Sequence, residues 1–263
     1  MTATPMPARK LVLLSNDDGH TSPGLRAMRE ALVRHGADVV VVAPEAEQSA
    51  SSHALSLHRP LRLRAASPGV FALDGTPADC VYLALYAGTR VLPRWPDVVV
   101  SGINHGMNLG QDAFYSGTVA AAREAAFRKI PALATSAHPA LDLDSVAELS
   151  ARLALALEAT GQAALFNLNV PPGWNGGLRA TRLGSRIYDE LIEFRADPRG
   201  REYVWLGGHA VRHERDPGSD TDAYDEGVAS VTPLLLDLTH TGEAQLAASV
   251  VAAMMAPTGA KRE

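Results

Sequence analysis

The stretch that decides the fold is LVLLSNDDGHTSPGLRAMREALVRHGADVVVVA, residues 11–43. It begins with the apolar run LVLLS and ends with the apolar run VVVVA, and the residues between them show helical spacing of apolar side chains. Ser22 is a suitable N-cap and Gly36 a suitable exit residue, so we expect a helix over Pro23–His35. A strand, a helix and a second apolar strand in this order predict a parallel β-α-β unit.

The same alternation continues to about residue 170. We expect further strands at residues 70–73, 97–101, 131–136 and 164–170, and helices at residues 76–87, 117–129 and 143–159. Continuous valine and leucine runs separated by helices predict an α/β protein with a mostly parallel sheet covered on both faces. In such a sheet, ligands bind beyond the carboxyl ends of the strands.

The C-terminal part has a different pattern. RIYDELIEF and REYVWLG flank the turn sequence DPRG, which predicts a long hairpin projecting from the sheet. A strand and an apolar-rich helix follow. We expect a disordered extension at residues 1–10 and one domain over residues 11–263, with its core at about 11–180 and 227–240, the hairpin at about 186–207 and the last helix at about 242–256. The appendage either serves oligomerisation or packs within its own chain.

Composition narrows the classes of function. The chain has 263 residues, 46% of them hydrophobic and 20% charged, as expected for one large α/β domain. A net charge of -5 without a basic block argues against a nucleic-acid polymer as partner. The single cysteine, Cys80, excludes an internal disulfide and fits a reducing compartment. With no signal-like or bilayer-length apolar run, we expect a cytoplasmic protein without a membrane partner.

Polar residues collect where the predicted strands end. Asp17 and Asp18 follow the first strand, and burying two adjacent carboxylates is costly without a cation, although Asn-Asp-Asp-Gly is also good turn chemistry. The fourth strand runs into SGINHGMNLG, rich in amides and glycines. Carboxylate, hydroxyl and amide oxygens are hard ligands suited to Mg²⁺ or Mn²⁺ rather than to zinc. The sequence therefore favours a hard cation at this edge of the sheet.

The segment YSGT precedes an alanine-rich helix. Ser116, Gly117 and Thr118 stand where a helix N-terminus offers free amides and two hydroxyls to an anion. The alternative is an ordinary capping serine or threonine. A cation beside a helix N-terminus is an arrangement that binds and activates a phosphate.

Several blocks of the sequence resemble the survival protein E (SurE) family in order and spacing, from about residue 11 to about residue 240. These blocks are LLSNDDGHTSPGLRAMREAL, APEAEQSASSHALSL, GTPADCVYLAL, VVSGINHGMNLGQDAFYSGTVAAAREA and GSDTDAYDEGVASVTPL. The resemblance implies a Rossmann-like three-layer core that forms dimers or tetramers through its C-terminal segments. It also implies a metal-dependent nucleoside 5′- and 3′-monophosphate phosphatase, with short polyphosphate as a further substrate in some members.

The resemblance also implies roles for individual residues. One divalent ion, Mg²⁺ or Mn²⁺, is expected on Asp17, Asp18, Ser49 and Asn104. The phosphate is expected at Asn108 and at Ser116, Gly117 and Thr118, with a further contact from His53, where members of the family carry Asn or His. GHTSPG and SASSH depart from the usual family sequences at positions that leave these ligands intact, so they bear on substrate preference.

These observations predict hydrolysis of a phosphomonoester by water, with Asp17 and Asp18 as the catalytic carboxylates and Asp18 as the preferred base. One alternative is a phosphatase that uses Asp17 as a nucleophile, although such enzymes place two aspartates one residue apart. The other is a nucleotide-binding module without activity. Neither G-x-G-x-x-G nor G-x-x-x-x-G-K is present to support that reading.

Overall fold

The computed structural model describes residues 9–188, 192–206 and 211–255. The extension expected at residues 1–10 therefore lies outside the described residues except at its last two positions, and so does residue 256 of the expected last helix.

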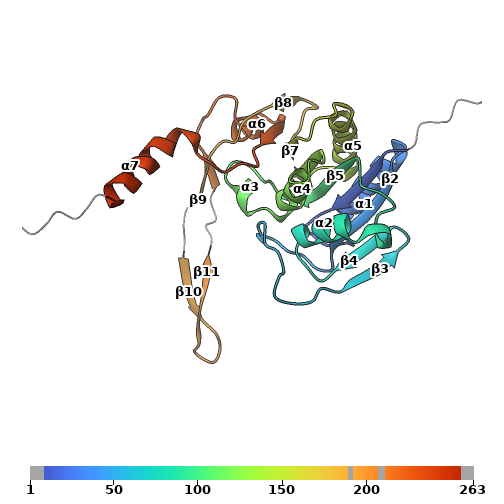
Figure 1. Cartoon of the computed structure of the whole chain (residues 1–263), viewed down its shortest axis with the longest axis horizontal. Helices are drawn as coiled ribbons and strands as arrows, with labels where there is room; N and C mark the ends of the chain where they lie inside the picture. Colours follow the sequence, from blue (N-terminus) through green and yellow to red (C-terminus); the bar gives the residue numbers. More distant parts are fainter. Residues whose placement is uncertain (1–8, 189–191, 207–210, 256–263) are drawn as a thin grey trace, which may run out of the picture.

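A nine-stranded sheet forms the centre of the molecule, in the order β3-β4-β2-β1-β5-β6-β7-β13-β8 (Figure 1). Its six central strands are all parallel, which confirms the predicted sheet. Chain order runs outward in both directions from the pair β1 and β5, so the sheet has the strand order of a Rossmann-like fold. The central strands are β4 (Val70–Leu73), β2 (Asp38–Pro44), β1 (Leu11–Ser15), β5 (Val98–His105), β6 (Ala132–Ala137) and β7 (Leu165–Val170).

Three outer strands complete the sheet. β3 (Leu63–Ser67) is antiparallel to β4, and β13 (Ala229–Leu234) is antiparallel to β7 and parallel to β8 (Leu178–Ala180). The sequence analysis did not predict β3 or β8. Every residue of β3 is exposed, so no apolar face marks it, and β8 has only three residues.

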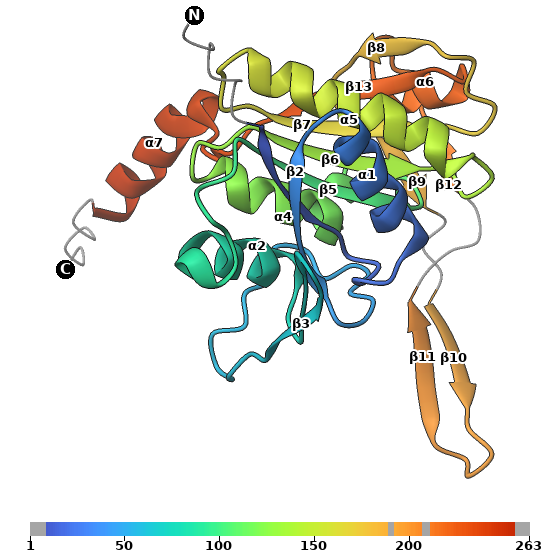
Figure 2. The same cartoon turned by 90° about the vertical axis from the view of Figure 1, so that its right-hand side faces the viewer.

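Helices cover both faces of the sheet (Figures 1 and 2). α1 (Pro23–Arg34) and α5 (Leu143–Ala159) share one buried apolar cluster with alternate strand residues such as Val12. α2 (Pro77–Tyr86) and α4 (Gly117–Ala126) share the other cluster with the intervening residues such as Leu13. Successive strand side chains point to opposite faces, so the two clusters are the two sides of the predicted three-layer core.

Local capping explains why the first helices begin where the sequence predicts. The Ser22 hydroxyl accepts a hydrogen bond from the Leu25 amide, and Thr76 and Asp79 form a reciprocal capping box. In each case a proline occupies the first helical position, where its missing N–H costs nothing.

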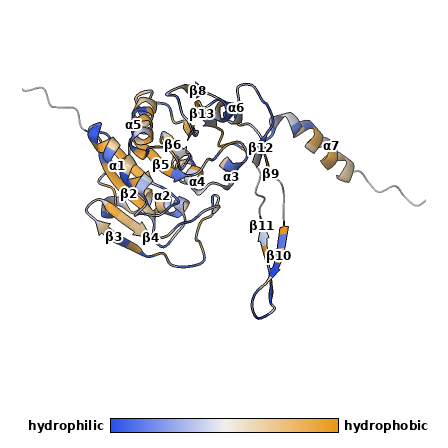
Figure 3. Cartoon of the chain, turned by 180° about the vertical axis from the view of Figure 1, so that it is seen from behind, coloured by the Kyte–Doolittle hydropathy of each residue, from blue (hydrophilic) through white to orange (hydrophobic). Residues whose placement is uncertain are grey.

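The hairpin strands β10 (Ile192–Ala196) and β11 (Glu202–Leu206) and the helix α7 (Ala244–Met255) project from this core (Figure 1). The hairpin consists of two antiparallel ladders, so the paired region extends beyond the predicted end at residue 207, to His213. α7 has no buried residue, and Figure 3 shows hydrophobic colour along it. None of the helices in the described ranges is long and apolar enough to cross a membrane. The remaining elements are η1 (Gly88–Arg90), α3 (Asp112–Tyr115), β9 (Arg186–Tyr188), β12 (Val211–His213), α6 (Asp220–Asp225) and η2 (Thr241–Glu243).

Candidate active site

A cavity of about 320 Å³ lies at the carboxyl ends of β1 and β5, where the strand order reverses. Six of the residues singled out from the sequence line it, although they come from four separate segments. They are Asp17, Asp18, Ser49, Asn104, Asn108 and Ser116. Glu47, Ala50, His105, Met107, Asp112 and Tyr115 complete the lining.

Asp17 is buried and held from the start of α4. Its carboxylate accepts hydrogen bonds from both the amide and the hydroxyl of Thr118, with 3.0 Å from the amide nitrogen to Oδ2. Burial raises the pKa of Asp17 to about 6, and the neighbouring Asp18 adds to the rise while Thr118 opposes it. The fold thus buries a carboxylate in surroundings that disfavour its ionised form.

Asp18 is only half-buried. Burial again raises the pKa of its carboxyl, partly offset by a hydrogen bond from the backbone of His105, while the nearby charge of Glu47 raises it further. Two adjacent carboxyls whose ionised forms are both disfavoured are the electrostatic signature of a site that binds a cation.

The loop after β2 brings hydroxyl groups to the same place. Ser49 is exposed and its hydroxyl donates to Glu47, 2.5 Å away. The Ser51 hydroxyl, by contrast, is buried and has no hydrogen-bond partner among the described residues. A Cβ placed on Gly117 would lie 2.9 Å from that hydroxyl and 3.0 Å from an Asp17 oxygen, so Ser51 stands close to Asp17. The sequence analysis gave Ser51 no role.

Asn104 occupies the end of β5, which runs four residues further than predicted. Its pairing with β6 is irregular between Ser101 and Asn104, and the peptide bond between Gly102 and Ile103 is cis. A side chain at Gly102 would lie 2.4 Å from the Thr135 carbonyl, so only glycine fits there. The Asn104 amide group donates to the Gly106 carbonyl at 2.9 Å, which leaves its carbonyl oxygen as a possible ligand.

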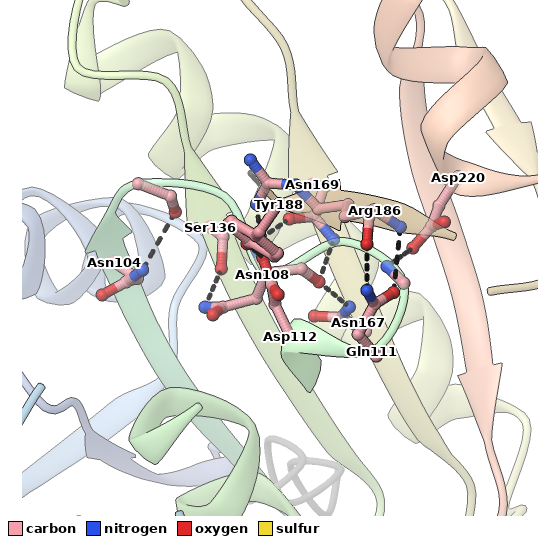
Figure 4. Close-up of polar contacts among 12 residues, drawn as sticks. Asn104, Asn108, Gln111, Asp112, Ser136, Asn167, Asn169, Arg186, Tyr188 and Asp220 are labelled. Atoms are coloured by element: carbon pink, nitrogen blue, oxygen red, sulfur yellow. Dashed lines mark hydrogen bonds and ion pairs between the residues drawn. The ribbon is translucent and has the colours of Figure 1, made fainter. Parts of the chain in front are cut away.

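Asn108 is fixed by a network of buried amides at the ends of β6 and β7 (Figure 4). Its side chain donates to the Ser136 hydroxyl at 2.8 Å. Its backbone exchanges hydrogen bonds with the Asn169 side chain and accepts one from Asn167. The two asparagines lie within an otherwise apolar strand, where their only evident use is to hold this loop.

Some hydrogen-bond donors in the turn at the start of α4 are already used within the protein. The Ser116 hydroxyl caps the helix by accepting a hydrogen bond from the Val119 amide, and both the amide and the hydroxyl of Thr118 donate to Asp17. The amide of Gly117 has no hydrogen-bond partner among the described residues. Thr118 is therefore a residue that orients Asp17, and the free donors of this turn are the Gly117 amide and the Ser116 hydroxyl proton.

His53 lies away from this cavity. Its ring pairs with Glu124 at 2.8 Å and packs against Phe127, and it lines a separate, more apolar cavity. The structure does not bring His53 together with the other predicted site residues.

Asp112 joins the cavity to the projecting hairpin, a connection that the sequence analysis missed. Its carboxylate accepts from the guanidinium of Arg186 and from the hydroxyl of Tyr188, both in β9 (Figure 4). Gln111 also accepts from the Arg186 backbone amide at 2.9 Å. Sequence spacing carries no signal for this contact, because about 75 residues separate the partners.

The donor set fits a hard divalent cation. No cluster of three or more His, Cys, Asp or Glu side chains able to hold a metal ion occurs among the described residues. An ion here would rely on two carboxylates with one hydroxyl and one amide carbonyl, which are oxygen ligands of the kind Mg²⁺ and Mn²⁺ accept. Such an ion would stabilise the buried negative charge of Asp17 and could accept the Ser51 hydroxyl oxygen, which has no hydrogen-bond partner among the described residues, as a further ligand.

Comparison with known proteins shows the family to which the chain belongs. The chain is 61% identical over 250 residues to a protein of Sorangium cellulosum named 5′-nucleotidase SurE, covering 92% of this chain and 96% of that one. A protein of the same name from Anaeromyxobacter dehalogenans (strain 2CP-C) is 53% identical over 235 residues, covering 87% and 91%. The crystal structure of the SurE protein of Aquifex aeolicus superposes with a TM-score of 0.79 at 35% identity, covering 92% of this chain and 99% of that chain. The family described as survival protein SurE matches residues 12–190. The chain belongs to the SurE family.

Proposed function

We propose that the chain is a 5′-nucleotidase, which hydrolyses nucleoside monophosphates in the cavity at the β1 and β5 strand ends. One divalent cation, Mg²⁺ or Mn²⁺, would be held by Asp17, Asp18, Ser49 and Asn104. Activity on 3′-monophosphates and on short polyphosphate is part of the same proposal, since the family resemblance carries both.

The charge of the cavity is the observation that carries the proposal. Four carboxylates line it, and no Lys or Arg does so among the described residues: Asp17, Asp18, Glu47 and Asp112. Arg186 forms an ion pair with Asp112, whereas Asp17, Asp18 and Glu47 have no ion pair with a Lys or Arg side chain among the described residues. Repulsion between two unit charges 4 Å apart is about 4 kcal/mol at a protein surface, so a phosphate needs a cation to enter.

When bound, the cation would offset this charge and polarise a phosphoryl oxygen. The chain's own residues then do three things. The Gly117 amide and the Ser116 hydroxyl are free donors that can stabilise charge growing on the phosphoryl oxygens. Thr118 fixes the direction in which Asp17 presents its oxygens, and the buried amide network fixes Asn108 beside the same cavity.

Asp18 is the better candidate for the base that orients or deprotonates the attacking water. Both oxygens of Asp17 accept hydrogen bonds from Thr118, whereas Asp18 is more exposed to solvent, so its carboxylate is the easier one for a water molecule to reach. A general base must lie within hydrogen-bond reach of the proton that it takes, so access to water decides between the two carboxylates.

We also propose that the chain forms a homo-oligomer through α7. This helix exposes five large apolar side chains to solvent in the isolated chain: Leu246, Val250, Val251, Met254 and Met255. An apolar face of this size on a helix without a buried residue fits an interface between copies.

A screen of phosphate release from nucleoside 5′- and 3′-monophosphates with Mg²⁺, Mn²⁺ or EDTA tests the proposal. We expect release with either metal and none with EDTA. Calorimetric titration of Mn²⁺ into the wild type and the Asp17→Asn variant adds a measurement that does not depend on activity. Binding of equal strength to both proteins would refute the assigned ligands.

A further inference from the structure

A second cavity, of about 500 Å³, opens beside the catalytic cavity and shares Asp18, Asn104 and His105 with it. Its other walls come from residues 21–24 at the start of α1 and from residues 137–143 between β6 and α5. We propose that this second cavity, here called the nucleoside cavity, binds the base and ribose of the substrate. The inference rests on the proposed function and adds to it the site that selects a nucleoside.

The lining of the nucleoside cavity suits an uncharged group. Asp18 is its only carboxylate, and no Lys, Arg or Glu lines it within the described part of the chain. Most of the wall is apolar: Pro23, Ile103, Ala137, Pro139, Leu141 and Leu143. A mostly apolar wall with a few polar groups is typical of small-molecule sites of this volume. A second phosphate would find no positive side chain here, so we expect nucleoside monophosphates to be preferred over bisphosphates.

Two polar side chains can recognise hydroxyls or ring nitrogens. The hydroxyl of Thr21 is exposed and has no hydrogen-bond partner among the described residues. Nδ1 of His138 accepts the amide of Ala140 at 3.3 Å, so in the neutral ring Nε2 carries the proton and is a donor. These groups can fix the orientation of a nucleoside whose apolar faces contact Leu141 and Leu143.

The sheet topology explains why the substrate would span both cavities. The nucleoside cavity lies at the first turn of α1, and the catalytic cavity reaches Ser116 at the first turn of α4. These two helices pack on opposite faces of the sheet. A ligand crossing the edge between β1 and β5 therefore places its phosphate on the α4 side and its nucleoside on the α1 side, as ligands do where the strand order reverses.

The more apolar cavity around His53 is the competing location. It is larger, about 630 Å³, but shares no lining residue with the catalytic cavity. Arg123 and Arg182 also line it, which gives it charges that a neutral base does not need. Phe127 in that cavity therefore supplies a matched control.

The test compares the Leu141→Ala and His138→Ala variants with Phe127→Ala on two substrates. AMP carries a nucleoside, and glycerol 2-phosphate is a phosphomonoester without one. For the first two variants we expect KM for AMP to rise on the order of tenfold, while kcat for AMP and kcat/KM for glycerol 2-phosphate stay within about twofold of the wild type. For Phe127→Ala we expect both substrates to be turned over as in the wild type. Thermal unfolding of each variant confirms that it is folded.

Equal losses on both substrates for Leu141→Ala and His138→Ala, or a selective loss on AMP for Phe127→Ala, would overturn the assignment. If the wild type released no phosphate from either compound, the proposed function would be wrong. Calorimetric binding of adenosine, which lacks a phosphate, would still decide the location: weaker binding to Leu141→Ala than to Phe127→Ala supports it, and the reverse order overturns it.

Discussion

At the scale of single residues, the carboxylate of Asp17 is disfavoured by burial and stabilised by hydrogen bonds from Thr118. Its carboxylate is almost wholly buried, yet Thr118 supplies two donors that only an acceptor can use. Asn keeps one acceptor oxygen and removes the charge. We expect Asp17→Asn to lower phosphate release by at least about a hundredfold, since a metal ligand contributes several kcal/mol to the transition state. The measurement is a steady-state assay on a nucleoside monophosphate with Mn²⁺.

The matched control for this substitution is Asp142→Asn. Asp142 is the exposed N-cap of α5, and asparagine caps a helix as well as aspartate. We expect this variant to keep wild-type activity and stability. A fully active, metal-responsive Asp17→Asn variant would contradict the role given to Asp17.

The raised pKa of Asp17 also predicts how the metal-free protein responds to pH. The carboxyl titrates near 6 in the folded state and near 3.8 in the unfolded state, so the folded state binds more protons between these values. The free energy of unfolding contributed by this group therefore falls as pH rises from about 4 to 6 and is level above that. The size is on the order of 2 to 3 kcal/mol.

Chemical unfolding in EDTA across pH 4 to 8 measures this effect, as the difference between wild type and Asp17→Asn. Above pH 6 we expect the variant to be the more stable protein. An unchanged difference over the whole range would show that Asp17 has an ordinary pKa. Saturating Mn²⁺ should reverse the order, because the ion binds only the folded wild type tightly.

Gly117 is the second residue whose identity the site requires. A Cβ there would lie 2.9 Å from Cβ of Asp17 and 2.9 Å from the Ser51 hydroxyl. We expect Gly117→Ala to displace Asp17 and lower kcat/KM by on the order of a hundredfold, since small displacements at a site are costly. Gly88→Ala is the control: nothing lies within 4 Å, and its φ of +59° should cost about 1 kcal/mol of stability without loss of activity.

At the scale of secondary-structure elements, the sequence predicts regular segments better than their connections. α5 begins and ends where predicted, because apolar periodicity and a capping aspartate both mark it. β5 runs past its predicted end at residue 101 into GINH, residues 102–105, because pairing with β6 resumes after the irregularity and strand propensity gives no sign of that. β3 is held by pairing alone, without a buried face.

The residues of the candidate site also fall into those that the sequence predicts and those that it does not. Asp17, Asp18, Asn104 and Asn108 were predictable, because strand ends of a parallel sheet meet at one edge. The role of Thr118 and the positions of Ser51 and His53 were not, because they depend on how loops fold over that edge. The contact between Asp112 and its partners in β9 could not be predicted, because it depends on the path of the hairpin in space, which sequence spacing does not give.

The contact between α3 and β9 carries its own prediction. Asp112 and Arg186 are each 16% exposed, and the Arg186 guanidinium also lies 5.4 Å from the ring centre of Tyr188. We expect Arg186→Gln to lower the free energy of unfolding by about 1 to 3 kcal/mol and to speed amide exchange in β9 and β12. Denaturant unfolding and hydrogen exchange measure the two effects.

Arg195→Gln supplies the comparison within the same hairpin. Its ion pair with Glu193 is 54% and 40% exposed, so its loss should cost less than about 0.5 kcal/mol. Equal costs for the two arginines would mean that the contact with Asp112 does not anchor the hairpin.

At the scale of the whole molecule, the catalytic chemistry and the proposed association occupy different parts of the chain. The described residues of both cavities lie in the core between residues 17 and 143, whereas α7 begins a hundred residues later. Figures 1 and 2 show α7 standing apart from the sheet. Loss of the oligomer should therefore leave the cavities formed, and the two properties can be changed independently.

The apolar stripe of α7 gives the test of this separation. Leu246, Val250 and Met254 recur every four residues and so lie along one side of the helix, and each is more than half exposed in the single chain. A charge placed in a buried apolar interface is strongly unfavourable, so we expect Leu246→Glu with Val250→Glu to reduce the mass in solution to the 27.8 kDa of one chain. Analytical ultracentrifugation measures the mass.

The control variant is Gln245→Glu, which adds charge to the same helix outside the stripe and should leave the oligomer intact. A wild-type mass of one chain, or an oligomer that survives both charges, would place the interface elsewhere or remove it, while an unchanged rate of phosphate release per chain in the double variant would confirm that each cavity is complete within one chain.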